Sequence, residues 1–396
     1  MNIAILGGGN IGTLLAAELA SKGHAVSVVT SEPSRWDHEV RAYDKDERLV
    51  FCGELANVTS DASCVDKACD MVLVTYPSFL LRKAAEMLLP VSHAGLKIGV
   101  VPGNGAEFYF SEHVRRGTVL FGLERTHDVA RIKEPGRSVY TLGRKAGIQV
   151  AALPRAMTHE VADDLRRLLG MPTEELPNYL VETLTPSNPV LHTARLRSMF
   201  ASWREGLFYD RNILFYEEWD MASAELLLAC DDELQGLCRR LEVLLGLDLS
   251  GVKSLREYYE SPTAEKMVAK LTSIPAFRGL TSPMKEEAPG KWIPDFENRY
   301  FKADFAYGLK AILDIARVAG EDMPHLHGVF SWYEKIAHPL TVFDATPASL
   351  EELSLIYRWA VFVDLSEVRA CRPSIPTTSS SRAAAASSAA TSCITW

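Results

Sequence analysis

The chain has 396 residues, of which 47% are hydrophobic and 23% charged, so it has an ordinary globular composition and room for two or three domains. Its formal charge of -9, with no basic run, argues against a nucleic-acid-binding surface. The seven scattered cysteines contain no C-x-x-C pair, which indicates neither a disulfide framework nor a metal site. No apolar run reaches the ~18 residues of a membrane span, and no signal peptide is evident. We therefore expect a cytoplasmic protein with reduced thiols and no membrane, metal or nucleic-acid partner.

The first thirty residues carry the strongest motif. An apolar strand over 2–6 is followed by the turn GGGNIG, a helical stretch over 13–21 and a second strand over 25–29. A G-x-G-x-x-G turn between a strand and a helix is the fingerprint of dinucleotide-binding βαβ units. A glycine-rich turn without a ligand is the alternative interpretation.

Each glycine of this turn has an expected role. Gly7 permits the tight turn, Gly9 lets the backbone approach a pyrophosphate, and Gly12 lets the helix pack on the strand. Free N–H groups at the start of the helix attract the phosphate charge. The predicted pyrophosphate contacts are Gly7, Gly9, Asn10, Ile11 and Gly12.

The end of the second strand is where such folds contact the adenosine ribose. An NAD site usually has Asp or Glu there, whereas this strand ends in Thr30 and Ser31, with Arg35 close behind. These groups suit a 2'-phosphate, so NADP(H) is favoured. NAD(H) is the alternative, because a small shift of the strand end would make Glu32 the ribose acceptor, and Arg35 would then be an ordinary loop charge.

Two further strands are expected to end near the nicotinamide. The buried run after Asp70 ends at Tyr76 and Pro77, and the next strand, over 97–101, leads into Pro-Gly-Asn-Gly. Pro77 and Asn104 are thus predicted cofactor contacts at the carboxyl edge of the sheet. A turn-forming role for Asn104 is equally compatible with the pattern.

The remaining chain predicts a change of architecture. Strands over 118–123, 138–143 and 148–152 extend the sheet, and a helix follows over 159–169. From 187 to about 365 the pattern is nearly all helical, with Pro and Gly in the joints. The expected helices span 190–200, 211–247, 264–271, 300–319 and 325–337.

The predicted fold is therefore an α/β Rossmann-type doubly wound sheet plus a second all-helical domain. We assign residues 1–180 to the dinucleotide-binding domain and residues 181–370 to a helical substrate and catalytic domain. Residues 371–396 are rich in Ser and Ala, cannot form a core, and are expected to be a disordered tail.

One histidine is placed differently from the other nine. In Ser-Asn-Pro-Val-Leu-His, Asn188 is a good N-cap and Pro189 fits the first helical position, so His192 falls near a helix N-terminus at the domain junction. The helix dipole disfavours an imidazolium there and attracts substrate anions, so a nearby carboxylate is needed to restore the basicity of the ring. A capped helix with an incidental histidine is the alternative.

A second candidate lies in the stretch IPDFENRYFKADFAYGL, residues 293–309. Arg299 can hold a substrate carboxylate bidentately, and Asp304 can orient an imidazole. On an α-helix, however, five residues place the two side chains roughly 140° apart, on different faces. The alternative is that Arg299 sits at the helix entry, where it can still converge with Asp304. The pattern alone therefore favours a capped helix with surface ion pairs.

Together with the glycine turn, the N-P-x-x-H motif of 188–192 and the R-Y-x-x-x-D motif of 299–304 resemble the opine dehydrogenases, the octopine/nopaline family. The resemblance extends to about residue 365. It implies a Rossmann domain joined to a helical domain, with the active site between them. It also implies NAD(P)H-dependent reductive condensation of an amino acid with an α-keto acid.

By this resemblance, the catalytic histidine corresponds to His192, its partner aspartate to Asp304 and the substrate-binding arginine to Arg299, with Asn188 beside them. The segment 121–125 is only loosely similar to the octopine enzymes, so the amino acid is left open. A homodimer is one expected assembly.

Two other functions fit the same domain plan. One is an NADP-dependent reductase of a keto or hydroxy acid, such as a ketopantoate reductase or a 3-hydroxyacid dehydrogenase, although these usually use a lysine for proton transfer. The other is a non-catalytic sensor that binds NADP(H) through the glycine turn.

Overall fold

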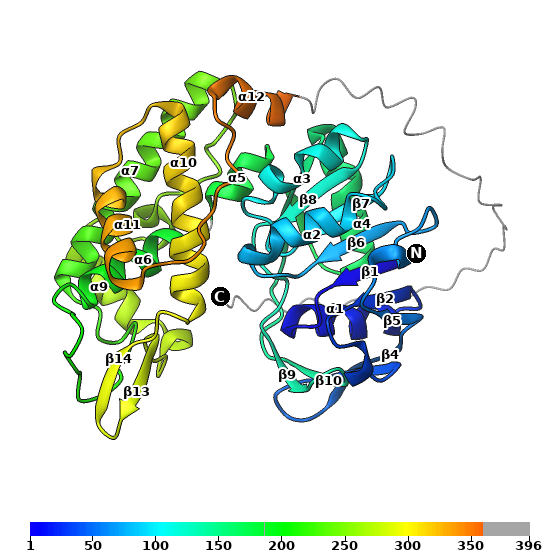
Figure 1. Cartoon of the computed structure of the whole chain (residues 1–396), viewed down its shortest axis with the longest axis horizontal. Helices are drawn as coiled ribbons and strands as arrows, with labels where there is room; N and C mark the ends of the chain where they lie inside the picture. The colour runs from blue at the N-terminus through cyan, green and yellow to red at the C-terminus, as the bar shows by residue number, and fades with distance from the viewer. Residues whose placement is uncertain (186, 359–396) are drawn as a thin grey trace, which may run out of the picture. The chain divides into compact units, whose positions relative to one another are not determined.

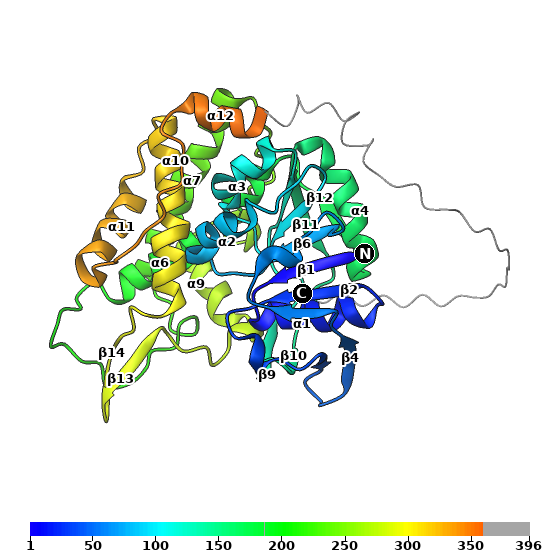
Figure 2. The ribbon, with the colours of Figure 1, turned by 45° about the vertical axis from the view of Figure 1, so that its right-hand side comes forward.

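The computed structural model describes residues 1–185 and 187–358, all within one compact unit, Met1–Val363 (Figures 1 and 2). The tail predicted over 371–396 lies outside the described residues. In the described part of the chain no helix is long and apolar enough to cross a membrane. The cysteines described there are free thiols: Cys52, Cys64, Cys69, Cys230 and Cys238.

The N-terminal half is built on a mainly parallel, eight-stranded sheet. Its central strands are short apolar runs that are buried on both faces, as expected for parallel strands covered by helices. Only β8 and β11 pair antiparallel. In spatial order the strands are β12 (Thr173–Glu175), β11 (Ile148–Leu153), β8 (Val119–Leu123), β7 (Lys97–Val100), β6 (Met71–Val74), β1 (Asn2–Leu6), β2 (Ala25–Val29) and β5 (Asn57–Thr59).

Four helices cover this sheet. Figure 2 shows α4 beside β11 and β12, which it contacts through its apolar face. Helix α1 is buried over eight consecutive residues, because it packs against β1 and β2 on one side and against a second sheet on the other. The helices are α1 (Asn10–Ser21), α2 (Leu81–Leu88), α3 (Ala106–Arg115) and α4 (Thr158–Leu169).

The second sheet has four strands, in the order β4 (Leu49–Glu54), β3 (Glu39–Tyr43), β10 (Ser138–Thr141) and β9 (Ala130–Glu134). The prediction that 138–143 extends the main sheet was wrong, since β10 pairs with β3 and β9 instead. The strand period reports local conformation but not the partner strand, and β3 comes from almost a hundred residues earlier in the chain.

The C-terminal half is mainly helical. Its elements are α5 (Tyr179–Leu184), α6 (Asn188–Met199), α7 (Met221–Leu245), α8 (Leu255–Tyr258), α9 (Ala264–Ser273), a π-helix (Tyr300–Leu309), α10 (Lys310–Ala319), α11 (Pro324–Ala337) and α12 (Leu350–Arg358). Helix α6 is buried all round, because it packs against α7, α11 and the π-helix. It is the central element on which the functional residues converge.

Three helical predictions need correction. The helix predicted over 211–247 begins only at Met221, since Asp220 caps it by accepting a hydrogen bond from the Ser223 N–H. The helix predicted over 300–319 is a π-helix for its first ten residues. The region also contains an antiparallel hairpin, β13 (Met284–Ala288) and β14 (Lys291–Pro294), visible in Figure 1.

A buried carboxyl cluster, made of Glu107, Glu182, Thr183 and Tyr357, ties α3 to α5 and α12. Glu107 Oε1 accepts hydrogen bonds from Thr183 Oγ1 at 2.6 Å and from the Tyr357 hydroxyl at 3.0 Å. Glu182 Oε1 accepts one from the Gly103 N–H at 3.0 Å. Burial raises the pKa of Glu107 to about 7 and also raises the pKa of Glu182. Glu107 is therefore uncharged in most molecules below pH 7, and the pKa of Glu182 is shifted in the same direction.

The cluster makes stability depend on pH. In the unfolded chain Glu107 has a pKa near its ordinary value of 4.5, against about 7 in the folded protein. Its stabilising contribution is therefore complete below pH 4.5 and is lost as the pH rises through 7, a change of about 3 kcal/mol. Glu107→Gln, which stays uncharged, should reduce the loss of unfolding free energy between pH 5 and 8 in urea titrations.

The matched control is Glu112→Gln on the exposed face of α3, where hydrogen bonds from Arg116 and Arg115 lower the carboxyl pKa against a small opposing effect of burial. It should keep the wild-type slope above pH 5. An unchanged slope in Glu107→Gln would contradict this account of the cluster.

Candidate active site

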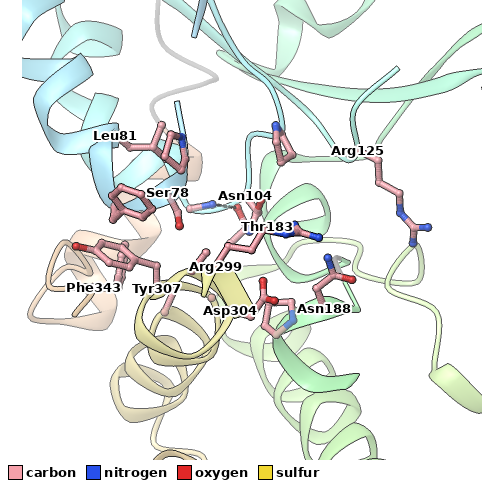
Figure 3. A pocket seen from close by; sticks show the side chains of 18 of the residues that line it. Ser78, Leu81, Asn104, Arg125, Thr183, Asn188, Arg299, Asp304, Tyr307 and Phe343 are labelled. Carbon is pink, nitrogen blue, oxygen red and sulfur yellow. Dashed lines mark hydrogen bonds between the residues drawn. The ribbon is translucent and has the colours of Figure 1, made fainter. Parts of the chain in front are cut away.

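A cavity of about 440 Å³ lies where the carboxyl ends of β6, β7 and β8 face α6 and the π-helix. Five of the residues predicted for the site line it: Pro77, Asn104, Asn188, Arg299 and Asp304. In Figure 3, Asp304 and Asn188 come from the helical elements, with Asn104 and Arg125 across from them. The structure thus brings together residues that are up to 227 positions apart, Pro77 and Asp304.

The π-helix explains how Arg299 and Asp304 both reach the cavity. An α-helix would have placed them on different faces, but a π-helix bonds residue i to residue i+5 and so stacks positions five apart. Arg299 stands at the N-cap of this helix with helical backbone angles, and Asp304 is its fifth residue. The α-helical spacing expected for the two residues was therefore wrong, whereas the alternative, convergence with Arg299 at the helix entry, agrees with the structure.

His192 and Asp304 are in direct polar contact. His192 Nδ1 lies 2.8 Å from Asp304 Oδ2, and His192 Nε2 lies 3.2 Å from the Tyr216 hydroxyl. With Nδ1–H donating to the carboxylate, Nε2 is left to accept from Tyr216. Asp304 is thus the carboxylate that the position of His192 near a helix N-terminus required.

The imidazole itself lies behind the cavity wall. His192 is 3% exposed and is enclosed by aromatic rings, stacked on Tyr300 at 4.2 Å between ring centroids and edge-on to Phe215 at 5.4 Å. Asp304 lines the cavity, so it is the member of the pair that a bound ligand can contact. Sequence reasoning missed this aromatic enclosure, because Phe215 and Tyr216 fall in a segment that was predicted to be helical.

The segment that carries Phe215 and Tyr216 is held by a buried arginine. Arg195, one turn after His192 on α6, donates to the Phe215 carbonyl at 3.2 Å and to the Glu218 carbonyl at 2.6 Å. It also donates to Ser223 Oγ at 2.8 Å. Helix α6 therefore positions the imidazole and, through Arg195, the tyrosine that caps it.

Asn188 was expected to be the N-cap of α6, and this was wrong. The helix already includes Asn188, and Ser187 occupies the cap position without a side-chain cap bond. The Asn188 side chain instead lines the cavity, one turn before His192 on the same helix face.

The glycine turn has the geometry that a phosphate cradle needs. Gly7 has φ +116°, which residues with a side chain rarely adopt. A Cβ on Gly12 would lie 1.8 Å from the Gly7 carbonyl oxygen, whereas a Cβ on Gly9 would meet no atom within 4 Å. Thr75 Oγ1 fastens the turn by donating to the carbonyls of Leu6 and Gly7. The residues present therefore fit a dinucleotide pyrophosphate.

The other predicted cofactor contacts surround this turn rather than the cavity. Asn10 Oδ1 accepts a hydrogen bond from the Ile132 N–H at 2.9 Å, which ties the turn to β9, and Ile11 is half-buried on α1. Thr30 is buried and Ser31 exposed just after β2. Arg35 forms an ion pair with Glu32 at 2.7 Å, and both side chains are more than half exposed.

Two alanine substitutions separate the roles of the glycines. Gly12→Ala should lower the free energy of unfolding by about 1–3 kcal/mol, because the added methyl group overlaps backbone. Gly9→Ala should leave stability nearly unchanged but weaken NADPH and NADH binding, because its methyl group enters the open cradle. Urea unfolding and fluorescence titration measure the two effects, and tight cofactor binding by Gly9→Ala would contradict the assignment of the cradle.

Comparison with known proteins agrees with both halves of the chain. The family model described as "NAD/NADP octopine/nopaline dehydrogenase, alpha-helical domain" matches residues 175–337, and the model "Ketopantoate reductase PanE/ApbA" matches residues 3–154. Octopine dehydrogenase of Mizuhopecten yessoensis is 27% identical over 85% of this chain and 90% of its own. Opine dehydrogenase of Haliotis discus hannai is 25% identical, with the same coverage.

Among solved structures, octopine dehydrogenase with NADH and L-arginine superposes with a TM-score of 0.78 at 23% identity, covering 96% of this chain and 100% of that one. The likeness supports the fold described above. The chain is an NAD(P)-dependent oxidoreductase with a Rossmann-type domain and a helical domain. Its helical half matches the octopine/nopaline dehydrogenase model, and most of its length is similar to octopine and opine dehydrogenases.

Proposed function

We propose that the protein condenses the amino group of an amino acid with an α-keto acid and reduces the resulting imine, as an opine dehydrogenase. The observation that carries the proposal is the His192–Asp304 pair behind a cavity that also holds Arg299, at the carboxyl edge of a dinucleotide-binding sheet. An acid–base group and a carboxylate-binding cation beside the expected nicotinamide position are what this reaction needs.

In the proposed reaction Arg299 binds the keto-acid carboxylate and Asn188 lies beside the reacting carbon. The amine attacks the carbonyl carbon and its nitrogen loses a proton, which gives a carbinolamine. The carbinolamine hydroxyl then takes up a proton and leaves as water, so that an imine remains. His192 supplies and removes these protons, and Asp304 balances the charge of the imidazolium. When bound, NAD(P)H supplies the hydride that reduces the C=N bond.

The Tyr216 hydroxyl is hydrogen-bonded to His192 Nε2 in this structure, and the imidazole does not line the cavity. Catalytic hydrogen bonds often form only when the substrate is present. The proposal therefore requires the Tyr216 hydroxyl to release Nε2, or to relay the proton, when the substrates bind.

We infer that the cofactor is NADP(H) in preference to NAD(H). No carboxylate stands at the end of β2 to accept from a ribose hydroxyl. The exposed Arg35 can exchange its partner Glu32 for a 2'-phosphate. We also propose that the two domains divide at residue 180 and that the protein forms a homodimer. A cytoplasmic location is a further proposal, which the unpaired thiols support.

The proposal predicts amine-dependent oxidation of NADPH. With pyruvate, 2-oxoglutarate or oxaloacetate and a panel of amino acids, absorbance at the nicotinamide band should fall only when both substrates are present, and kcat/KM should be higher for NADPH than for NADH. Reduction of a keto acid without any amine would instead favour a ketopantoate reductase-like enzyme. Helix α6 contains no lysine, which argues against that alternative.

His192→Gln tests the proposed acid–base role. The glutamine removes the proton-transfer group, so kcat should fall about 100- to 10,000-fold while NADPH binding measured by fluorescence is unchanged. A control, His159→Gln, changes an exposed histidine on α4 and should retain full activity. Near-normal turnover of His192→Gln would remove His192 from the mechanism, and cofactor binding without turnover in the wild type would indicate a sensor.

A further inference from the structure

Three charged residues from the loops of the sheet line the cavity, and the mechanism above uses none of them. Glu124 and Arg125 follow β8, and Lys145 lies in the loop that leads into β11. The two loops are joined by main-chain hydrogen bonds, from the Lys145 N–H to the His127 carbonyl at 3.0 Å and from the Glu124 N–H to the Gln149 carbonyl at 3.1 Å. The positions of the three residues are therefore set by the sheet.

The charges on the cavity wall do not balance. The lysine and arginine side chains that line it are Arg125, Lys145 and Arg299, against the carboxylates Glu124 and Asp304. Each carboxylate already has a partner, since Glu124 Oε1 lies 3.0 Å from Arg125 Nε and Asp304 contacts His192. No described residue accepts a hydrogen bond from Lys145 Nζ. With three cations against two carboxylates, the cavity wall carries an excess of one positive charge, and that excess lies with Arg125 and Lys145.

Arg125 and Lys145 both carry hydrogen-bond donors that no described residue uses, so a ligand can accept from them. Arg125 uses Nε for Glu124 and one terminal nitrogen for the Tyr258 hydroxyl at 2.8 Å, which leaves N–H donors of its guanidinium unused. Burial, and then the nearby Arg125, lower the pKa of Lys145. A bound anion would relieve both effects, because it would supply hydrogen-bond acceptors and a neutralising charge.

We propose that Arg125 and Lys145 form a second carboxylate subsite that binds a carboxylate of the amino-acid substrate. This inference rests on the proposed function, because the product of that reaction carries one carboxylate from each substrate. Arg299, from the helical elements, binds the carboxylate of the keto acid, and Arg125 and Lys145, from loops of the sheet, bind that of the amino acid. Figure 3 shows Arg299 and Arg125 on their separate elements. The two like-charged carboxylates are thereby held apart while the amine and the carbonyl carbon meet between them.

A neighbouring cavity gives the rest of the amino acid room. It measures about 360 Å³ and is lined by the same Glu124, Arg125 and Lys145, together with Gln149 and Tyr258 among others. A molecule held at this subsite can therefore extend away from the reacting atoms without meeting the core.

The experiment is a two-substrate kinetic comparison of Lys145→Met with Arg299→Ala. Lys145→Met should raise the KM of the amino acid about 10- to 100-fold, the effect of losing one charged hydrogen-bonding group, and leave the KM of the keto acid unchanged. Arg299→Ala should do the reverse, raising the KM of the keto acid about 30-fold or more. Lys145→Arg should restore most of the affinity for the amino acid.

Lys253→Met is the matched control, because Lys253 forms only an exposed ion pair with Glu257, and it should change neither constant. Circular dichroism checks that Lys145→Met folds, and if it does not, Lys145→Gln replaces it. Equal effects of the lysine substitution on both constants, or an effect on neither, would overturn the proposal.

Substrate pairs distinguish which carboxylate is bound. If it is the α-carboxylate, wild type should use L-alanine far better than ethylamine, and Lys145→Met should lose this preference. If it is a side-chain carboxylate, Lys145→Met should affect L-glutamate but not L-glutamine.

A wild-type enzyme without turnover on any amino acid would contradict the proposed function and not, by itself, the subsite. Calorimetric titration with L-glutamate then decides. Binding that Lys145→Met abolishes supports a carboxylate subsite, and binding that it leaves unchanged, or no binding to wild type, overturns it.

Discussion

The contact between Asp304 and His192 depends on a helix that is wound more widely than an α-helix. In the π-helix Tyr300–Leu309, residues five apart share a face, so Arg299 and Asp304 both reach the cavity while Tyr300 turns inward to stack on the imidazole. Such windings are less stable than α-helices and are found mostly at functional sites. In this protein the neighbouring α6 supports the winding, since the two elements pack closely along Pro189 and Gly308.

The site is assembled from loops of the sheet and from side chains of the helical elements. The sheet contributes loops whose positions follow from strand pairing, and the buried carboxyl cluster fastens the Gly103–Gly105 loop, and with it Asn104, to α5. The helical elements contribute side chains that are buried among aromatic rings and held in one orientation. Preorganisation of this kind is the main source of rate enhancement available to a positioned acid–base group.

Much of this arrangement could be predicted from the sequence. The strand, glycine turn and helix of the first thirty residues follow from local pattern, and the roles expected for Gly7 and Gly12 agree with the φ angle and the close approach that the structure shows. The position of His192 in the first turns of its helix could be predicted from Pro189, although the cap is Ser187 and not Asn188. The pairing of β10 with β3 could not be foreseen, because hydrophobic alternation does not name a partner strand.

The site residues that were missed can be recognised only from contacts that form in the folded chain. Tyr216 and Arg195 act through contacts between segments about twenty residues apart, and Lys145 is notable only because no described residue accepts a hydrogen bond from its Nζ. The π-helix was also invisible, since its apolar spacing was indistinguishable from that of an α-helix. Interpreting 300–319 as one regular helix therefore favoured separate faces for Arg299 and Asp304 over their convergence at the helix entry.

The two borders of the cavity differ in their response to ionic strength. On one side the buried carboxyl cluster joins groups that are mostly uncharged and shielded from solvent, so dissolved ions cannot screen it. On the other, Arg82 at the start of α2 pairs with Asp344 in the segment after α11, and both side chains are more than half exposed. Concentrated salt weakens that exposed pair and leaves the cluster intact, so the border beside α2 is the one that loosens first.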